Sequence, residues 1–146
     1  MIVVANRQSW PVDLRRIRRT VRTALRALGV WDHELSLTLV NDRTIRALNA
    51  RYRGVRRRTD VLAFPLSGPA PIVGEAIISV ETAQRQAGAL GHSLREELDL
   101  LCCHACLHLV GYDDRQLLEA RLMHAREMDL LGRLYERPAR TLHVGA

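Results

Sequence analysis

The spacing of the apolar residues changes along the chain, and this change constrains the fold more than any other feature. Residues 33–40 alternate between polar and apolar side chains, which is typical of a strand with one buried face. Between residues 12 and 28 the apolar positions instead lie three or four residues apart, on one face of a helix. Because both periods recur along the chain, the sequence predicts an α+β domain in which helices pack against a sheet.

The remaining segments extend this order. Strands are expected at 1–6, 60–64 and 73–80, and helices at 81–90, 94–110, about 116–136 and around Ile45, Leu48 and Tyr52. Pro11 suits the first turn of the helix at 12–28, and Asn41 or Asp42 suits the N-cap of the next helix. Ser93 and Glu96 have the spacing of a capping box at the start of the helix at 94–110.

Length and composition fit a single domain. With 146 residues, of which 47% are hydrophobic, the chain can bury an ordinary core. We expect one domain over residues 1–146, with one mixed four-stranded sheet, about five helices, a turn at 67–71 and a loose tail at about 137–146. No apolar run reaches the roughly 18 residues of a membrane helix, and the N-terminus does not resemble a signal peptide. Three cysteines within five residues are not a disulfide framework, so we expect a cytoplasmic protein with no membrane and no disulfide partner.

The positive charge is concentrated in the first half of the chain. The formal net charge is +6, and all 22 cationic side chains are arginines. Residues 1–66 contain 14 arginines and 5 acidic residues, whereas residues 67–146 contain 8 arginines and 11 acidic residues. This asymmetry indicates a polyanionic partner that approaches one side of the molecule. Ordinary solvated helix faces are the alternative explanation.

Two histidines in the expected helix at 94–110 are candidate metal ligands. His104 and His108 lie four residues apart, so both rings project from one face of the helix. The helix is expected to end at Gly111, and the turn that follows can bring a third ligand toward the pair. Such a set leaves coordination positions open, as catalytic sites do. Taken alone, however, the pair also fits two ordinary helix histidines.

Neighbouring residues of the same helix suggest two other kinds of site. Cys102 and Cys106 are rotated by about 200° from the histidine pair. They are therefore expected in the core, and a structural Cys/His zinc site is the alternative. A metalloprotease is disfavoured because Ala105 stands where the H-E-x-x-H motif has glutamate.

The histidine pair belongs to a longer motif. Residues 104–114, H-A-C-L-H-L-V-G-Y-D-D, resemble the pattern H-G-x-L-H-L-x-G-Y-D-H of the YbeY-type endoribonucleases, the bacterial rRNA maturation factors. Seven of its nine fixed positions match, and Ala105 and Asp114 differ. Segments 48–54, 59–65, 74–79 and 81–87 are similar, in the same order, to the family's L-N-x-x-[YF]-R-G, T-D-V-L-S-F-P, G-D-I-x-I-S and E-T-A-x-x-Q-A. The chain is thereby identified as a member of this family.

The resemblance implies a metal-dependent hydrolase fold and a single-strand-directed endoribonuclease. It also implies a role in 16S rRNA 3′-end maturation and ribosome quality control, with RNA, ribosomal particles and ribosomal proteins as partners. The family's metal ligands are the three histidines of the motif, of which His104 and His108 are present here. One divalent ion per chain is expected, with Zn²⁺ the leading candidate.

The third ligand position of the motif is Asp114. A carboxylate can complete a triad with two histidines, but its negative charge should make the site less electrophilic than a third imidazole would. Slower or more alkaline-shifted chemistry follows as a hypothesis. Asp114 could instead cap the last helix, although Asp113 is the better cap because Gln116 completes a capping box with it. We therefore expect Asp114 to be a metal ligand.

The basic loop after the second helix is the expected RNA-binding element. Arg53 matches the family's R-G pair and is the candidate catalytic and RNA-binding residue, since a guanidinium can clamp a phosphate and stabilise charge in the transition state. Arg56, Arg57 and Arg58 are expected to contact backbone phosphates without sequence choice, with a solvated loop as the alternative.

Phe64 and Tyr112 are expected to be packing residues, and His124 is expected on the surface. Glu75 lies in a matched segment and could orient water or serve the structure. Besides the nuclease, a ribosome-associated assembly factor with a structural or impaired metal site remains open because of Asp114. A hydrolase of peptides is disfavoured by the missing glutamate and by the arginine-rich loop.

Overall fold

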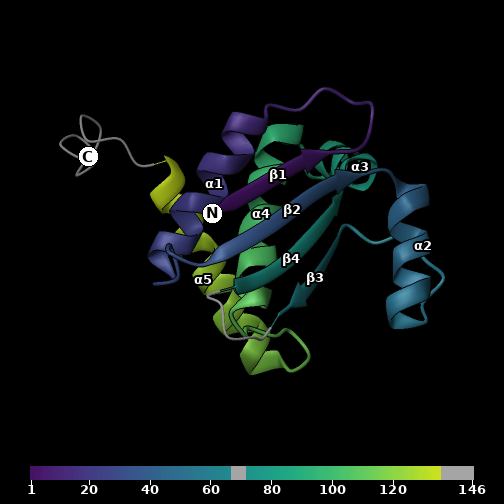
Figure 1. Cartoon of the computed structure of the whole chain (residues 1–146). Helices are drawn as coiled ribbons and strands as arrows, with labels where there is room; N and C mark the ends of the chain where they lie inside the picture. The colour runs from purple at the N-terminus through teal and green to yellow at the C-terminus, as the bar shows by residue number, and fades with distance from the viewer. Residues whose placement is uncertain (67–71, 136–146) are drawn as a thin grey trace.

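The extended segments form one mixed four-stranded sheet (Figure 1). Its strands are β1 (Ile2–Asn6), β2 (Glu34–Val40), β3 (Val61–Pro65) and β4 (Ile72–Ser79). They lie in the order β1-β2-β4-β3, with β1, β2 and β4 parallel and β3 antiparallel to β4. Since β3 is at the edge, one of its sides is left free to border a cleft.

The computed structural model describes residues 1–66 and 72–135. The turn expected at 67–71 and the tail expected at 137–146 lie outside these residues. Five helices accompany the sheet in the described part: α1 (Leu14–Ala27), α2 (Asp42–Arg53), α3 (Val80–Leu90), α4 (Leu94–Leu109) and α5 (Leu117–Tyr135). The prediction of an α+β fold is confirmed. None of these described helices is both long and apolar enough to cross a membrane.

The register of the strands gives the sheet two different faces. Leu35, Leu37 and Leu39 of β2 are all buried on one face. On the same face, β4 places Ala76 beside Leu37 and Ile78 beside Leu39. This is the alternation that the sequence at 33–40 predicts. The face forms the base of the main hydrophobic core.

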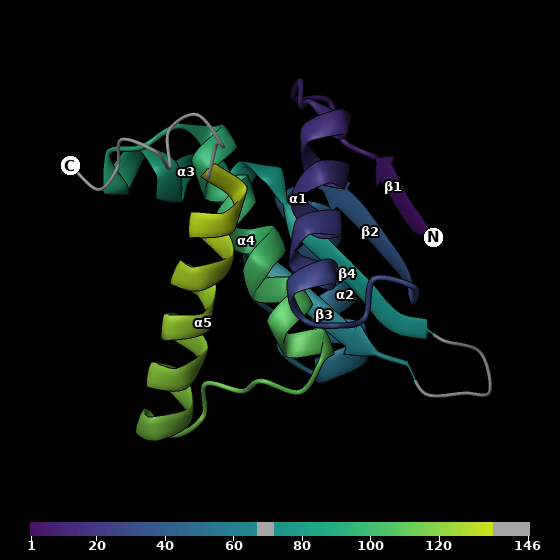
Figure 2. The ribbon, with the colours of Figure 1, turned by 90° about the vertical axis from the view of Figure 1, so that its left-hand side faces the viewer.

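Helix α4 lies in the middle of this core. It packs against α1, α3, α5, β3 and β4, and Figure 2 shows it between α5 and the sheet. Its buried positions combine leucines with small side chains, namely Cys102, Cys103, Ala105 and Cys106. Small side chains let neighbouring elements approach an enclosed helix closely.

Helix α2 covers the opposite face of the sheet. Its Ile45 is buried with Leu62 of β3 and Ile77 of β4 in a second, smaller cluster. Both faces next to β3 are therefore occupied, one by α4 and the other by α2. This arrangement brings the C-terminal parts of two helices to the same edge strand.

One helix start differs from the prediction. Asp13 is the N-cap of α1, and its carboxylate accepts hydrogen bonds from two backbone N–H groups of the first turn. The helix therefore begins at Leu14, and Pro11 lies before it instead of in its first turn. The caps at Asn41 and Ser93 are confirmed, including the capping box of α4.

A buried carboxylate joins three helices. Asp99 of α4 accepts hydrogen bonds from the Arg16 guanidinium at 2.6 Å, the Thr20 hydroxyl at 3.0 Å and the Tyr135 hydroxyl at 2.7 Å. Burial and the Asp99 carboxylate raise the pKa of Tyr135 to about 12, so the phenol remains a donor. α1 and α5 are thus tied to the side of α4.

At Gly74, β4 approaches β3 and the end of α4 closely. Its φ is +150°, a conformation that residues with a Cβ rarely adopt. A Cβ at this position would overlap the carbonyl oxygen of Phe64 and lie 2.7 Å from Leu109 Cδ2. Backbone conformation and space both require glycine here.

We expect Gly74→Ala to lower the free energy of unfolding by about 3 kcal/mol, because backbone strain and overpacking add together. Gly88→Ala is the matched control. Gly88 lies in α3, where an added Cβ would meet no atom within 4 Å, so this change should stabilise the protein by about 0.5–1 kcal/mol. Urea unfolding followed by circular dichroism measures both. Equal stability of the two variants would contradict the close approach.

Candidate metal centre

His104 and His108 face each other on the open side of α4. Their Nε2 atoms are 3.1 Å apart, and the rings meet edge to face with centroids 4.6 Å apart. Both rings are only partly buried, whereas the neighbours Ala105 and Leu107 are buried in the core. Packing on the other sides of α4 therefore leaves the histidine strip as the part that reaches the cleft.

The chain after α4 brings Asp114 to the histidines. The turn begins at Gly111, with φ +105°, and the backbone N–H of Tyr112 donates to the carbonyl of Leu107. One ligand atom from each of His104, His108 and Asp114 then lies within 4.8 Å of the others. The chain thus converges on the set that the motif predicted.

This donor set fits a divalent transition-metal ion. Two ligands bound to a tetrahedral ion at about 2.0–2.1 Å lie roughly 3.3–3.4 Å apart, close to the 3.1 Å between the two Nε2 atoms. Two imidazole nitrogens and one carboxylate oxygen suit zinc or iron, and three protein ligands leave room for others. Among the described residues, no other group of three or more His, Cys, Asp or Glu side chains converges in this way.

The capping alternative for the acidic pair is wrong. α5 begins at Leu117, so Gln116 stands directly before the helix and Asp113 cannot form the expected capping box with it. The Asp113 carboxylate instead accepts from the backbone N–H of Asp114 at 2.7 Å and pairs with Arg115 at 3.0 Å. Neither aspartate occupies the N-cap position, which leaves the Asp114 carboxylate available to the histidines.

The cysteines do not contribute to a metal site in the described part of the chain. Cys102, Cys103 and Cys106 are buried in the main core, as predicted, and none belongs to the converging group. Burial raises the pKa of Cys106 to about 12, and it also raises the pKa values of the other two thiols. Protonated thiols are poor metal ligands, so these residues serve packing.

Glu127 of α5 is a site residue that the sequence did not suggest. Its side chain is buried, and its Oε1 lies 3.2 Å from His104 Nδ1. An ionised carboxylate can only accept, so Nδ1 carries the proton of this bond and Nε2 is left to face His108. A carboxylate in this place orients the ring and fixes the tautomer that a metal ligand needs.

The surrounding charges act differently on the two rings. Burial disfavours protonation of His104, but the Glu127 hydrogen bond and charge, with Asp60 and Asp114, outweigh it and raise its pKa. Burial and the neighbouring His104 lower the pKa of His108. The carboxylates around His104 thus favour a cation at that ring, whereas His108 favours its neutral form, which is the form that binds a metal ion.

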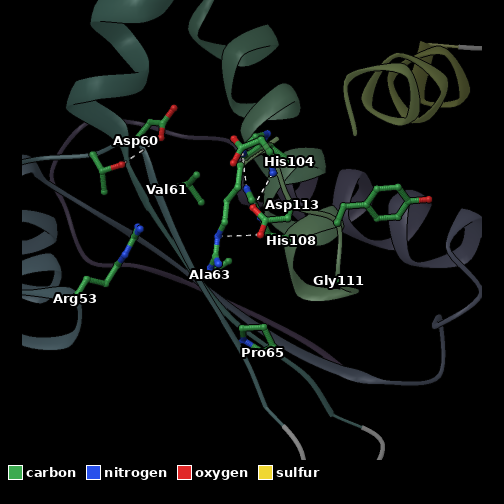
Figure 3. A pocket seen from close by; sticks show the side chains of 13 residues that line it. Arg53, Asp60, Val61, Ala63, Pro65, His104, His108, Gly111 and Asp113 are labelled. Atoms are coloured by element: carbon green, nitrogen blue, oxygen red, sulfur yellow. Dashed lines mark hydrogen bonds and ion pairs between the residues drawn. The ribbon is translucent and has the colours of Figure 1, made fainter. Parts of the chain in front are cut away.

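A cleft of about 600 Å³ contains the candidate centre (Figure 3). The edge strand β3 forms one wall with Val61, Ala63 and Pro65, and the histidines form another. Arg53, the last residue of α2, reaches the same cleft from the opposite side of β3. A cation of the chain and a candidate metal site thus border one space that is open to solvent.

Other predicted residues lie elsewhere. Arg56, Arg57 and Arg58 do not line this cleft but border a separate hollow on α2. Glu75 of β4 lies beside Ser36 of β2 in the strand register, on the face of the sheet opposite to α4. It is therefore not placed to orient water at the histidines. His124 is exposed, as predicted.

The two aromatic residues pack as expected. Phe64 joins the smaller cluster beneath α2 and meets the Tyr52 ring edge to face, at 5.6 Å between centroids. Tyr112 packs against the main core. Neither arrangement leaves a stacking platform of several rings in the cleft.

The fold and the cleft define a small α+β protein with a candidate metal centre on a core helix. Residues 3–135 match the model of the family described as Endoribonuclease YbeY, and the chain belongs to this family. The resemblance seen in the five sequence segments is therefore confirmed.

Relatives described as Endoribonuclease YbeY occur in several bacteria. The chain is 44% identical to one from Moorella thermoacetica over 145 residues, covering 88% of this chain and 93% of the relative. It is 42% identical to one from Pelotomaculum thermopropionicum over 127 residues, covering 81% and 84%. It is 44% identical to one from Anaeromyxobacter sp. over 119 residues. This match covers 80% of this chain but only 62% of the relative.

A solved structure has the same fold. The solution structure of TM1509 from Thermotoga maritima superposes with a TM-score of 0.67 and covers 92% of this chain and 89% of its own. Its sequence identity is 22%, so this likeness concerns the fold alone.

Glu127→Gln should weaken metal binding without unfolding the protein. The amide keeps the shape of the carboxylate but removes the charge that orients His104, and the affinity for Zn²⁺ should fall by about 10-fold or more. Competition with a chromogenic chelator measures it. Glu119→Gln, an exposed change on the same helix, should leave the affinity unchanged. Equal affinities for wild type and Glu127→Gln would show that the carboxylate does not support the site.

The neighbouring aspartates allow a matched test of the third ligand. Protein purified without a tag or chelator should contain one transition-metal ion per chain, and Asp114→Ala should lose it. Asp113→Ala should retain it, because Asp113 is paired with Arg115. Elemental analysis measures the metal content. Retention by Asp114→Ala would remove this residue from the ligand set.

Proposed function

We propose that this protein is a metal-dependent endoribonuclease that cleaves single-stranded RNA. One observation carries the proposal: the converging group His104, His108 and Asp114 borders the same cleft as Arg53. Cleavage of a phosphodiester requires a group that activates the nucleophile and a cation that holds the phosphate. Membership of the Endoribonuclease YbeY family supports RNA as the substrate.

In this proposal each side chain has a defined part. A divalent ion, when bound, supplies Lewis acidity toward water and the phosphoryl oxygen. His104, His108 and Asp114 would hold it, and Glu127 keeps the Nδ1 proton of His104 in place. Arg53 donates two N–H groups to the phosphate from the far wall of the cleft and stabilises the charge that develops on it.

The carboxylate of Asp114 adjusts this chemistry. Compared with a third imidazole, it adds one negative charge beside the ion and lowers the electrophilicity of the centre. The proposed enzyme should therefore work more slowly, or at higher pH, than one with three histidines. The leading ion is Zn²⁺, because two nitrogens and one oxygen are among its preferred ligands.

The family resemblance supports a more specific role. We propose that the substrate is ribosomal RNA in the cytoplasm, with cleavage in 16S rRNA 3′-end maturation and in ribosome quality control. Ribosomal particles and ribosomal proteins are the corresponding partners. The excess of arginine in residues 1–66 is consistent with such a polyanionic partner.

Asp114 also favours a second candidate, a ribosome-associated assembly factor that binds RNA through an impaired or structural metal site. The two functions separate in one experiment. Protein loaded with Zn²⁺ is incubated with labelled single-stranded RNA, with duplex RNA of the same sequence and with precursor 16S rRNA. The nuclease should cleave the single strand, lose activity with a chelator and regain it with metal. Binding to ribosomal particles without any cleavage would select the assembly factor.

Arg53→Gln should lower kcat/KM for single-stranded RNA by about 100-fold, because it removes a donor that stabilises the transition state. Metal content should stay at the wild-type level. Arg51→Gln is the matched control, since it removes the same charge from the same helix at a residue that lies over the Tyr52 ring. Single-turnover cleavage rates measure both. Equal losses would indicate general electrostatic attraction instead of a clamp.

A further inference from the structure

A second hollow lies along α2 and shares no lining residue with the cleft. Its volume is about 820 Å³. We call it the arginine groove; it is lined by Asp42, Arg43, Arg46, Ala47, Ala50, Arg56, Arg57 and Arg58. Five of these eight residues are arginines, so the groove is much more basic than the cleft.

Helix geometry and one buried side chain assemble this groove. Arg43, Arg46 and the two alanines lie three or four residues apart, on one face of α2. The loop that carries Arg56 to Arg58 is fixed beside that face by Asn49, whose Nδ2 donates to the Arg57 carbonyl at 3.0 Å. Asn49 is itself 4% exposed, so the loop is anchored from inside the protein. The backbone positions of the groove arginines are therefore fixed by helix α2 and by the hydrogen bond from Asn49.

The positive charge of the groove is not neutralised by the protein. All five arginines are exposed, and none forms an ion pair with a carboxylate of the described residues. Asp42 is the only acidic residue in the lining. Its carboxylate accepts from Ser79 at 2.7 Å, from Thr82 at 2.6 Å and from Arg85 at 2.7 Å, and so it is directed to α3. Five uncompensated cations in one hollow favour an anionic occupant with several charges.

The groove continues from the cleft along the chain. Arg53 borders the cleft and Arg56 borders the groove, so their Cα atoms are at most about 11 Å apart. An RNA strand with one phosphate bound at Arg53 would therefore need only a few further nucleotides to reach the groove. The alanines between the arginines give the floor an apolar surface for sugar rings.

We propose that the arginine groove binds the sugar–phosphate backbone of single-stranded RNA a few nucleotides away from the scissile phosphate. The path of the strand from the cleft to the groove rests on the proposed function. Binding in the groove does not depend on it. Hydrogen bonds from arginine to phosphates carry no sequence information, so the groove supplies affinity and register without sequence choice. Removal of one phosphate-binding arginine should reduce the salt dependence of binding by about 0.7 in log–log slope.

The test uses holoprotein and a fluorescent oligothymidylate of about 16 nucleotides, a single-stranded probe that a ribonuclease does not cleave. Arg43→Gln combined with Arg46→Gln should weaken binding about 10-fold near 0.1 M salt and lower the slope by about 1.4. Arg19→Gln combined with Arg22→Gln is the matched control. These exposed arginines have the same spacing on α1, so their loss should change neither value. Fluorescence anisotropy over a salt series measures both variants.

A second variant tests the same groove without removing an arginine. Ala47→Glu places a carboxylate on the exposed floor, in a helix that tolerates glutamate, and should weaken the probe to a similar degree. Cleavage of an oligoribonucleotide too short to span both sites should keep its wild-type kcat in each variant, since the cleft is intact.

The outcomes separate the two proposals. Equal losses in the α1 and α2 variants, or no loss in either, would overturn the groove. Unchanged nucleic-acid binding with weakened binding to polyglutamate would assign it to an acidic protein, and would also overturn the proposal. Wild-type holoprotein that cleaves no RNA but loses probe affinity in the α2 variants would contradict the proposed nuclease and leave the groove in place.

Discussion

The enclosure of α4 between the sheet and the other helices is the constraint on which the rest of the structure depends. Because its leucines and small side chains face the core, the helix cannot rotate without exposing apolar surface. Only the strip with His104 and His108 opens to the cleft. Asp99 fastens one part of the helix to α1 and α5, and the close approach at Gly74 fits its other end against β4. The two candidate histidine ligands are thus preorganised by the same contacts that stabilise the fold.

The main elements could be predicted because their patterns are local. Alternation at 33–40 marks the buried leucines of β2, and Ser93 with its capping box marks the start of α4. The errors concern the starts of two helices. Asp13 is the N-cap of α1, so Pro11 lies outside the first turn, and Asp113 bonds to its neighbour and to Arg115 instead of capping α5. Sequence spacing shows that a side chain can form such a bond, but not which of its neighbours it chooses.

Some residues of the candidate site could likewise be predicted from local sequence, and others could not. His104, His108 and Asp114 converge because they lie within eleven consecutive residues, and the motif was sufficient to bring them together. Glu127 could not be found from the sequence, since its contact depends on how α5 packs on α4. Arg53 lies at the cleft and Arg56 to Arg58 at the groove because Asn49 anchors the loop that carries the latter. Sequence periodicity does not predict the conformation of such a loop. The roles of these residues in metal and RNA binding remain predictions.

The absence of lysine from the chain has a consequence for how the molecule responds to its surroundings. A guanidinium keeps its proton at any pH at which a protein of this kind stays folded. The electrostatic attraction between the arginine-lined surfaces and a polyanion is therefore constant across the acid and alkaline range of a cell. Sensitivity to protons at the candidate metal centre arises instead from the histidines, from the carboxylates around them and from the substrate. Recruitment of a partner and the chemistry performed on it are in this way controlled by separate variables, ionic strength for the first and acidity for the second.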